Sequence, residues 1–194
     1  MTKDREQTEK KILEAVGKIV ESNGFEAVGV NAVAAESGVS KVLIYRYFGS
    51  IDQLLAKYVE QNDFWLNYQF ENIPSGDVKS FATGIFREYV NLLRNTPSLR
   101  RLYRWELTSQ HPSIAILRQK REETALKIIE TVCKASGEEF DHVAGISTLI
   151  TASISYLCIL AENCGVYNSL QIDSESGWEK IIETIDFMFN KLIK

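Results

Sequence analysis

A short stretch of the chain combines two cations with an aromatic ring at helical spacing. The outward side of a predicted helix that ends at Phe48 carries Lys41, Val42, Tyr45 and Arg46. An arginine can pair with a guanine edge through two hydrogen bonds, whereas a tyrosine ring can contact a thymine methyl group and place its hydroxyl on a phosphate. These side chains therefore predict contact with double-stranded DNA.

Two short helices joined by a tight turn are predicted to position these side chains. In the segment 30–48, Ala34 is small enough for a second helix to cross it closely, and Gly38 supplies the left-handed conformation that ends the first helix. Val39 fills the corner, and Ser40 is a good N-cap for the second helix. This pattern is typical of a helix-turn-helix, which places its second helix in the DNA major groove. A helical hairpin with no role in DNA binding is the alternative.

With its neighbouring residues, this hairpin resembles the tetracycline-repressor (TetR) family of bacterial transcription regulators. The resemblance covers about residues 8–60 and includes, beside the hairpin, Gly24, Phe25, Tyr45, Tyr47, Phe48 and Leu54. It implies an all-α protein of about nine helices. Residues 1–50 would form the helix-turn-helix DNA-binding domain, and residues 51–194 a helical domain for effector binding and dimerisation.

The resemblance also implies roles for single side chains of the hairpin. Base or groove contacts fall to Val42, Tyr45 and Arg46. The candidates for phosphate contact are Ser40, Lys41 and Tyr47. Tyr47 can equally be an aromatic residue of the core.

Three positions depart from the usual pattern of the family. Gly29 stands where a threonine commonly caps the second helix and touches phosphate. Val42 stands where a glycine often lets the backbone approach DNA, and Ile51 stands where a lysine commonly contacts phosphate at the start of the fourth helix. The resemblance therefore implies DNA binding, while the target and the affinity stay open.

The composition allows a substantial core but gives no bulk signal for DNA binding. The chain has 194 residues, 45% of them hydrophobic, and a net charge of −4. The first fifty residues carry seven basic and seven acidic side chains, so any attraction to phosphate must be local. The three cysteines form no CxxC motif and the N-terminus is highly charged, which favours reduced thiols in a cytoplasm and no signal peptide.

Apolar spacing predicts helices along the whole chain. They cover residues 5–22, the two arms of the hairpin, 51–70, 78–94, a segment that Pro97 opens, a segment that ends near 135, 141–163, and 175–194. A break is predicted at 73–76, and a loop rich in glycine, serine and asparagine before 175. The uncharged segment 143–161 is long enough to cross a membrane. Its serine, threonine and glycine content favours a buried bundle helix instead, so no membrane partner is expected.

The last two predicted helices have surfaces suited to helix packing. One side of the helix over 141–163 is small, at Gly145, Thr148, Ala152 and Ser155. The final helix has an apolar stripe that includes Trp178, Ile182, Ile185 and Phe189. Such surfaces let two helices cross closely, and the resemblance implies a four-helix dimer interface built from them. The alternative is that both surfaces serve only the core of one chain.

Aromatic residues in the middle of the chain are candidates to line a cavity between helices. The predicted ligand-binding set is Trp65, Tyr68, Phe86, Tyr89, Trp105, Glu106, Tyr156 and Asn163. Ligand pockets are mainly apolar with a few polar groups. This set therefore favours a hydrophobic or aromatic small-molecule effector, although most of these rings can equally be ordinary core residues.

Motifs for catalysis or metal binding are weak. Glu139 and His142 have the spacing of a di-iron bundle motif, but such a site needs a second copy and further inward glutamates. The only other histidine is His111, which precedes a proline. The sequence contains no GxSxG, GxGxxG or GKS/GKT segment. We therefore expect no cofactor, no metal and no enzymatic activity.

The sequence as a whole predicts a ligand-responsive transcription regulator. It would bind a palindromic DNA operator as a homodimer, act as a repressor and be released by a small hydrophobic effector. Two alternatives remain: a helical small-molecule-binding protein or enzyme that keeps the hairpin as a scaffold, and a regulator that acts through a partner protein. The sequence identifies neither the operator nor the effector, nor the sign of regulation or the regulated genes.

Overall fold

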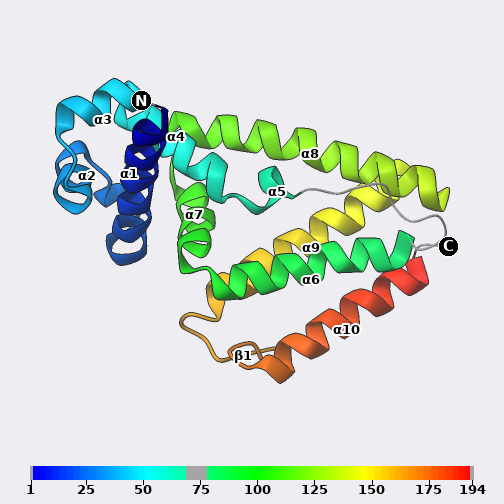
Figure 1. Ribbon diagram of the computed structural model, residues 1–194. Coiled ribbons are helices and arrows are strands. Elements are labelled where there is room, and N and C mark those ends of the chain that lie inside the picture. Colours follow the sequence, from blue (N-terminus) through cyan, green and yellow to red (C-terminus); the bar gives the residue numbers. More distant parts are fainter. Residues whose placement is uncertain (1, 69–77, 193–194) are drawn as a thin grey trace. The chain divides into compact units, whose positions relative to one another are not determined.

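The computed structural model describes residues 2–68 and 78–192 (Figure 1). These residues form ten α-helices, one short 3-10 helix and one two-stranded hairpin. The elements are α1 (Thr2–Asn23), η1 (Phe25–Ala27), α2 (Val30–Ser37), α3 (Lys41–Phe48), α4 (Ile51–Asn62), α5 (Phe64–Asn67), α6 (Val78–Asn95), α7 (Pro97–Thr108), α8 (Pro112–Ser136), α9 (Phe140–Leu160), β1 (Val166–Tyr167), β2 (Leu170–Gln171) and α10 (Glu175–Leu192). The structure is 83% helical, which confirms the predicted all-α class.

The chain divides into two compact units. Unit 1 combines Met1–Asn67 with Pro97–Arg121, and unit 2 combines Tyr68–Thr96 with Glu122–Lys194. Helix α8 begins in unit 1 and continues into unit 2. Helices α4, α5 and α7 therefore pack with the helix-turn-helix. The functional division at residue 50 stays a prediction.

The core of unit 1 is built on the inner face of α1. Ile12, Val16 and Val20 have no exposed surface there, and α1 packs against α2, α4 and α7. Phe25 of η1 stacks on Trp105 of α7, with ring centroids 4.6 Å apart and the planes at 7°. This packing holds the frame on which α2 and α3 are mounted.

Helix α4 ends earlier than the sequence predicts. The prediction of a single helix over 51–70 is wrong, because the backbone of Asp63 is extended, with φ −76° and ψ 133°. Its carboxylate Oδ1 accepts a hydrogen bond from the Leu66 amide at 3.1 Å, which starts α5. The predicted break at 73–76 lies outside the described residues.

The core of unit 2 lies where α6 packs against α9 and α10. Phe86 of α6 and Phe189 of α10 have ring centroids 5.7 Å apart. Trp178 is almost completely buried, and its indole Nε1 donates to the Ile172 carbonyl at 2.7 Å. Trp178 and Phe189, both predicted for a dimer interface, thus contribute to the core of their own unit.

A small hairpin joins α9 to α10 where the sequence predicts only a loop. Strands β1 and β2 pair in antiparallel register. Asn168 and Ser169 form the turn, with φ of 46° and 66°. Turns of this kind usually contain an asparagine–glycine pair, and the serine at the second position weakens that signal in the sequence.

Candidate nucleic-acid interface

The turn between α2 and α3 has the conformation that its residues favour. Gly38 ends α2 with φ 65° and ψ 16°, the left-handed conformation predicted for it, and its amide donates to the Ala34 carbonyl at 3.0 Å. Ser37, which is not in the predicted set, braces the same turn. Its hydroxyl donates to the Val33 carbonyl at 2.6 Å and accepts from the Val39 amide at 3.2 Å. Hydrogen bonds as well as the glycine therefore fix the turn.

Helix α3 is anchored along its inner side. The Ser40 hydroxyl accepts from the Leu43 amide at 3.4 Å, so the predicted N-cap is present. Ile44 has no exposed surface, and Val39 is buried at the corner. Because the inner side is held in this way, the outer side of α3 has a defined orientation.

The outer side of α3 presents polar and apolar groups together. Val42 is 78% exposed and Tyr45 is 45% exposed. Lys41 and Arg46 are also exposed. An exposed valine and tyrosine beside an arginine offer both apolar contact with thymine methyl groups and hydrogen bonds to guanine edges. The DNA contacts of these four residues stay predictions.

The two other predicted phosphate residues have different surroundings. Ser40 is exposed, but its hydroxyl already caps α3. Tyr47 is half-buried, and the Arg5 guanidinium lies 5.5 Å from its ring centroid. Tyr47 therefore combines a packed ring with access to solvent, and both roles that the sequence leaves open remain compatible with its position.

Three cations of α1 and α3 are not neutralised within the described chain. Among the side chains that the structure describes, Lys11, Lys41 and Arg46 make no ion pair. Lys11 belongs to α1 and is not in the predicted set. Its amine lies 3.8 Å from the point that a Cβ atom on Gly38 would occupy, so the packing of α1 brings it to the turn. The balanced charge of the first fifty residues thus conceals local positive charge suited to phosphate.

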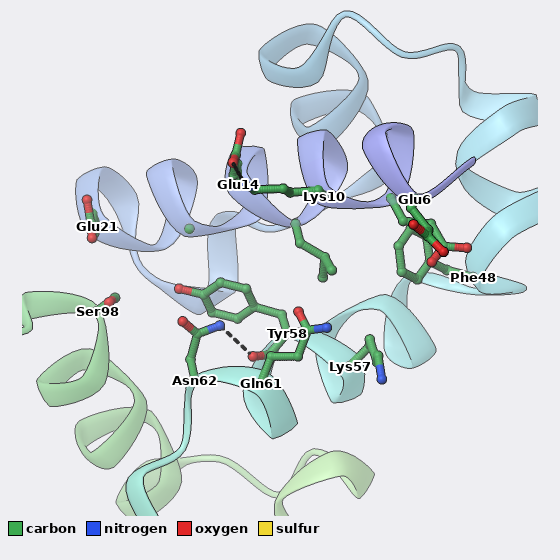
Figure 2. A pocket seen from close by; sticks show the side chains of 13 residues that line it. Glu6, Lys10, Glu14, Glu21, Phe48, Lys57, Tyr58, Gln61, Asn62 and Ser98 are labelled. Atoms are coloured by element: carbon green, nitrogen blue, oxygen red, sulfur yellow. Dashed lines mark hydrogen bonds and ion pairs between the residues drawn. The ribbon is translucent and has the colours of Figure 1, made fainter. Parts of the chain in front are cut away.

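A cleft of about 480 Å³ with several charged side chains in its lining lies between α1 and α4 in unit 1 (Figure 2). Its lining includes Glu6, Lys10, Glu14, Lys57 and Gln61. Burial raises the pKa of the Tyr58 hydroxyl at this cleft, although a hydrogen bond with Ser98 opposes the rise. The eight predicted ligand-binding residues, all of them described, lie elsewhere. The charged lining makes this cleft unlike the aromatic cavity that the sequence predicts.

The predicted ligand-binding residues are divided between the two units. Those in unit 1 are Trp65, Trp105 and Glu106. Those in unit 2 are Tyr68, Phe86, Tyr89, Tyr156 and Asn163. Trp105 is buried in its stack with Phe25, and the Tyr89 hydroxyl lies 2.7 Å from the Ser155 hydroxyl oxygen. Their ligand-binding role stays a prediction.

The predicted dimer residues fall into two groups by exposure. Those that are buried or half-buried are Trp178, Ile182, Ile185, Phe189 and Ser155. Those exposed along α9 are Gly145, Thr148 and Ala152. The first group favours the alternative of an intrachain core, and the second offers a surface for another helix. The interface role of both groups stays a prediction.

These features define a helix-turn-helix protein whose second helix is capped, anchored and exposed on its outer side. Residues 12–58 match the bacterial regulatory proteins of the tetR family. No curated protein sequence matches the chain.

Among the solved structures that share the fold are the following three. A TetR family transcription regulator from Marinobacter aquaeolei VT8 is 17% identical, with a TM-score of 0.64 over 100% of this chain and 98% of that one. GusR from Salmonella enterica is 16% identical, with a TM-score of 0.61 over 96% of this chain and 95% of that one. HlyIIR, a hemolysin II transcriptional regulator, is 14% identical, with a TM-score of 0.52 over 98% of this chain and 99% of that one.

Residues 12–58 are thus similar to the tetR family of bacterial regulatory proteins, the family that the sequence resembles, and the whole chain shares its fold with a solved regulator of that family. The chain has an N-terminal helix-turn-helix and a helical C-terminal region, and the family match over the helix-turn-helix supports a DNA-binding regulator. Proteins of this family are generally transcription factors without enzymatic activity.

Proposed function

We propose that the protein is a ligand-responsive repressor that binds a palindromic operator as a homodimer and is released by a small hydrophobic effector. The outer side of α3 carries the proposal, because Val42, Tyr45 and Arg46 are exposed there together with Lys41, and no acidic side chain among the described residues pairs with either cation. Phosphate contacts by the cations position α3, and contacts of the other side chains with base edges select the sequence. The protein then acts in the cytoplasm.

The surface of α9 supports the assembly of two copies. This helix is long and apolar enough to cross a membrane, and only 22% of its most apolar stretch is buried within the described chain. Most of that stretch is therefore exposed in a single copy. Leu149 is 67% exposed and Tyr156 is 55% exposed. A protein in water seldom leaves such a surface uncovered. A second copy, related by a two-fold axis, covers it with the same surface, which accounts for the apolar character of α9 without a membrane.

A two-fold dimer presents two copies of α3 to DNA in opposite directions. The matching operator is an inverted repeat whose half-sites lie about one helical turn, ~34 Å, or a multiple of it apart. Operator affinity then depends on the separation of the two copies of α3. An effector that binds better to an arrangement with another separation weakens DNA binding by its difference in affinity for the two arrangements.

The test is a gel-shift assay with the DNA that flanks the protein's own gene, with and without hydrophobic compounds that raise the thermal unfolding temperature of the protein. We expect a specific complex that such a compound dissociates. If compounds bind but no DNA sequence is preferred, the protein is a helical small-molecule-binding protein that keeps the hairpin as a scaffold. If a specific complex forms and no binding compound changes it, the effector part of the proposal is wrong.

A further inference from the structure

A cluster of charged side chains is buried in unit 1 where α4 ends. The Asp63 carboxylate has no exposed surface, and the guanidinium of Arg121 donates to its Oδ2 through Nε at 2.8 Å and Nη2 at 2.5 Å. The remaining Arg121 nitrogen, Nη1, pairs with Glu106 Oε2. We call Asp63, Arg121 and Glu106 the charge clamp. It joins the end of α4 to α7 and α8.

The charge clamp is held in one geometry by further contacts. The other Glu106 oxygen pairs with Arg118 Nε at 3.0 Å, and the other Asp63 oxygen caps α5. The guanidinium carbon of Arg121 lies 4.5 Å from the Tyr103 ring centroid. Burial would lower the pKa of Arg121, but Tyr103, Asp63 and Glu106 outweigh it and raise that pKa above its ordinary value. Arg121 thus stays protonated, and all three nitrogens of its guanidinium are engaged by the two carboxylates.

The burial of the charge clamp bears on whether it stabilises unit 1 or positions α4. Removing charges from water costs about as much as their mutual attraction returns, so apolar replacements of such pairs are often as stable as the originals. A planar guanidinium bound through two nitrogens to one carboxylate instead restricts distance and direction. The charge clamp therefore fixes the position of α4 more than it stabilises unit 1.

The other end of α4 is tied to the same stretch of chain. His111 Nε2 lies 3.2 Å from Asp52 Oδ1, and His111 Nδ1 accepts from the Ser113 amide at 3.2 Å. The neutral ring therefore carries its proton on Nε2 and donates to Asp52. The Ser113 hydroxyl donates to the Asp52 carbonyl at 3.4 Å. Both ends of α4 are thus attached to residues 111–121, and α4 follows directly after α3.

We propose that Arg121 is a positioning residue for operator binding: through the charge clamp it fixes α4, and with it α3, at the separation that the two half-sites require. This inference rests on the proposed function.

The test removes the clamp without leaving an unpaired buried charge. In the double variant Asp63→Asn with Arg121→Met, the asparagine oxygen can still cap α5, and Glu106 keeps Arg118 as its partner. The matched control is Glu60→Gln with Lys120→Met, which removes a pair of 2.7 Å between the same two helices, about half-exposed on both sides. Arg121→Lys keeps the charge but cannot donate to both carboxylates in the same geometry.

Fluorescence anisotropy measures binding to the operator, to operators with the spacer lengthened or shortened by one or two base pairs, and to DNA with one half-site scrambled. For the clamp variant we expect unchanged thermal unfolding, unchanged binding to the single half-site, and an operator affinity lower by about tenfold with most of the spacer preference lost. The control should behave as wild type, and Arg121→Lys should lie between.

Wild-type spacer preference in both the clamp variant and Arg121→Lys would overturn the inference. If the double variant does not fold, Arg121→Lys decides alone, because it retains a cation between the two carboxylates. A wild-type protein that prefers no DNA sequence would overturn the proposed function itself. If instead the wild-type protein distinguishes the spacer lengths and the variants distinguish them equally well, only the role of Arg121 is overturned.

Discussion

At the scale of single residues, Gly29 and Gly38 at the two ends of α2 differ in how strongly the backbone conformation favours a glycine. Gly38 has φ 65°, a conformation that side-chain-bearing residues rarely adopt. Gly29 has φ −134° and ψ 161° at the N-cap of α2, and a Cβ atom there would meet no atom within 4 Å. The backbone therefore favours a glycine at position 38 but not at position 29.

Replacement of Gly38 by valine should unfold the hairpin rather than change its specificity. The left-handed conformation costs a residue with a Cβ atom about 1–2 kcal/mol, and a β-branched residue resists it more. Thermal unfolding followed by circular dichroism measures the loss. Gly38→Asn is the control, because asparagine tolerates this conformation. A valine variant with wild-type stability would show that the turn is built differently.

Replacement of Gly29 by threonine should stabilise the start of α2. A threonine hydroxyl can accept from an amide of the first turn of α2, where Gly29 provides no side-chain cap. We expect a gain of a few tenths of a kcal/mol up to about 1 kcal/mol in the free energy of unfolding. We also expect tighter binding to all DNA, since the family resemblance implies a phosphate contact. Unchanged stability together with unchanged affinity would contradict both parts.

Replacement of Arg46 by alanine distinguishes base contact from phosphate contact. If Arg46 reads a base, the variant should lose about 1–3 kcal/mol on the operator and much less on random DNA. Competition binding with both DNAs gives the two losses. Lys11→Ala, at a cation beside the turn, should instead weaken binding to both DNAs alike. An equal loss on both DNAs for Arg46→Ala would assign Arg46 to phosphate.

At the scale of elements, local patterns predict a helix or a turn where neighbouring residues determine it. Gly38 and Ser40 place the turn and the start of α3 by their own backbone preferences. The end of α4 is not predictable in this way, because Asp63 is held by Arg121, which is distant in sequence. The turn at Asn168 and Ser169 is missed because its positive φ angles occur without a glycine.

Replacement of Ala152 by arginine tests the exposed side of α9. If two copies of α9 cross there, an unpaired charge in the interface costs several kcal/mol. We expect monomers or aggregates by light scattering, a folded N-terminal hairpin and a collapse of operator affinity. Ala115→Arg, the same change at an exposed position of α8, should leave assembly and binding unchanged. An Ala152 variant that stays dimeric with normal operator binding would move the dimer contact elsewhere.

At the scale of the whole molecule, the residues of the first sixty positions predict the family, because the motifs of the hairpin are local in sequence. The ligand and dimer assignments depend on packing instead. Trp178 has the spacing of an interface residue but is buried against Ile172 in its own unit. Trp105 has the character of a pocket residue but stacks on Phe25. Periodicity predicts that such residues are buried, and it does not distinguish which partner buries them.

The central claim is that the outer side of α3 selects a DNA sequence. The most direct measurement is competition binding of the full-length protein to its operator and to random DNA across a range of salt concentrations. We predict that operator binding is tighter by about 10³-fold or more, that the logarithm of the affinity falls linearly with the logarithm of salt concentration, and that an inverted repeat is protected in a footprint. Equal affinity for operator and random DNA at moderate salt would contradict the claim.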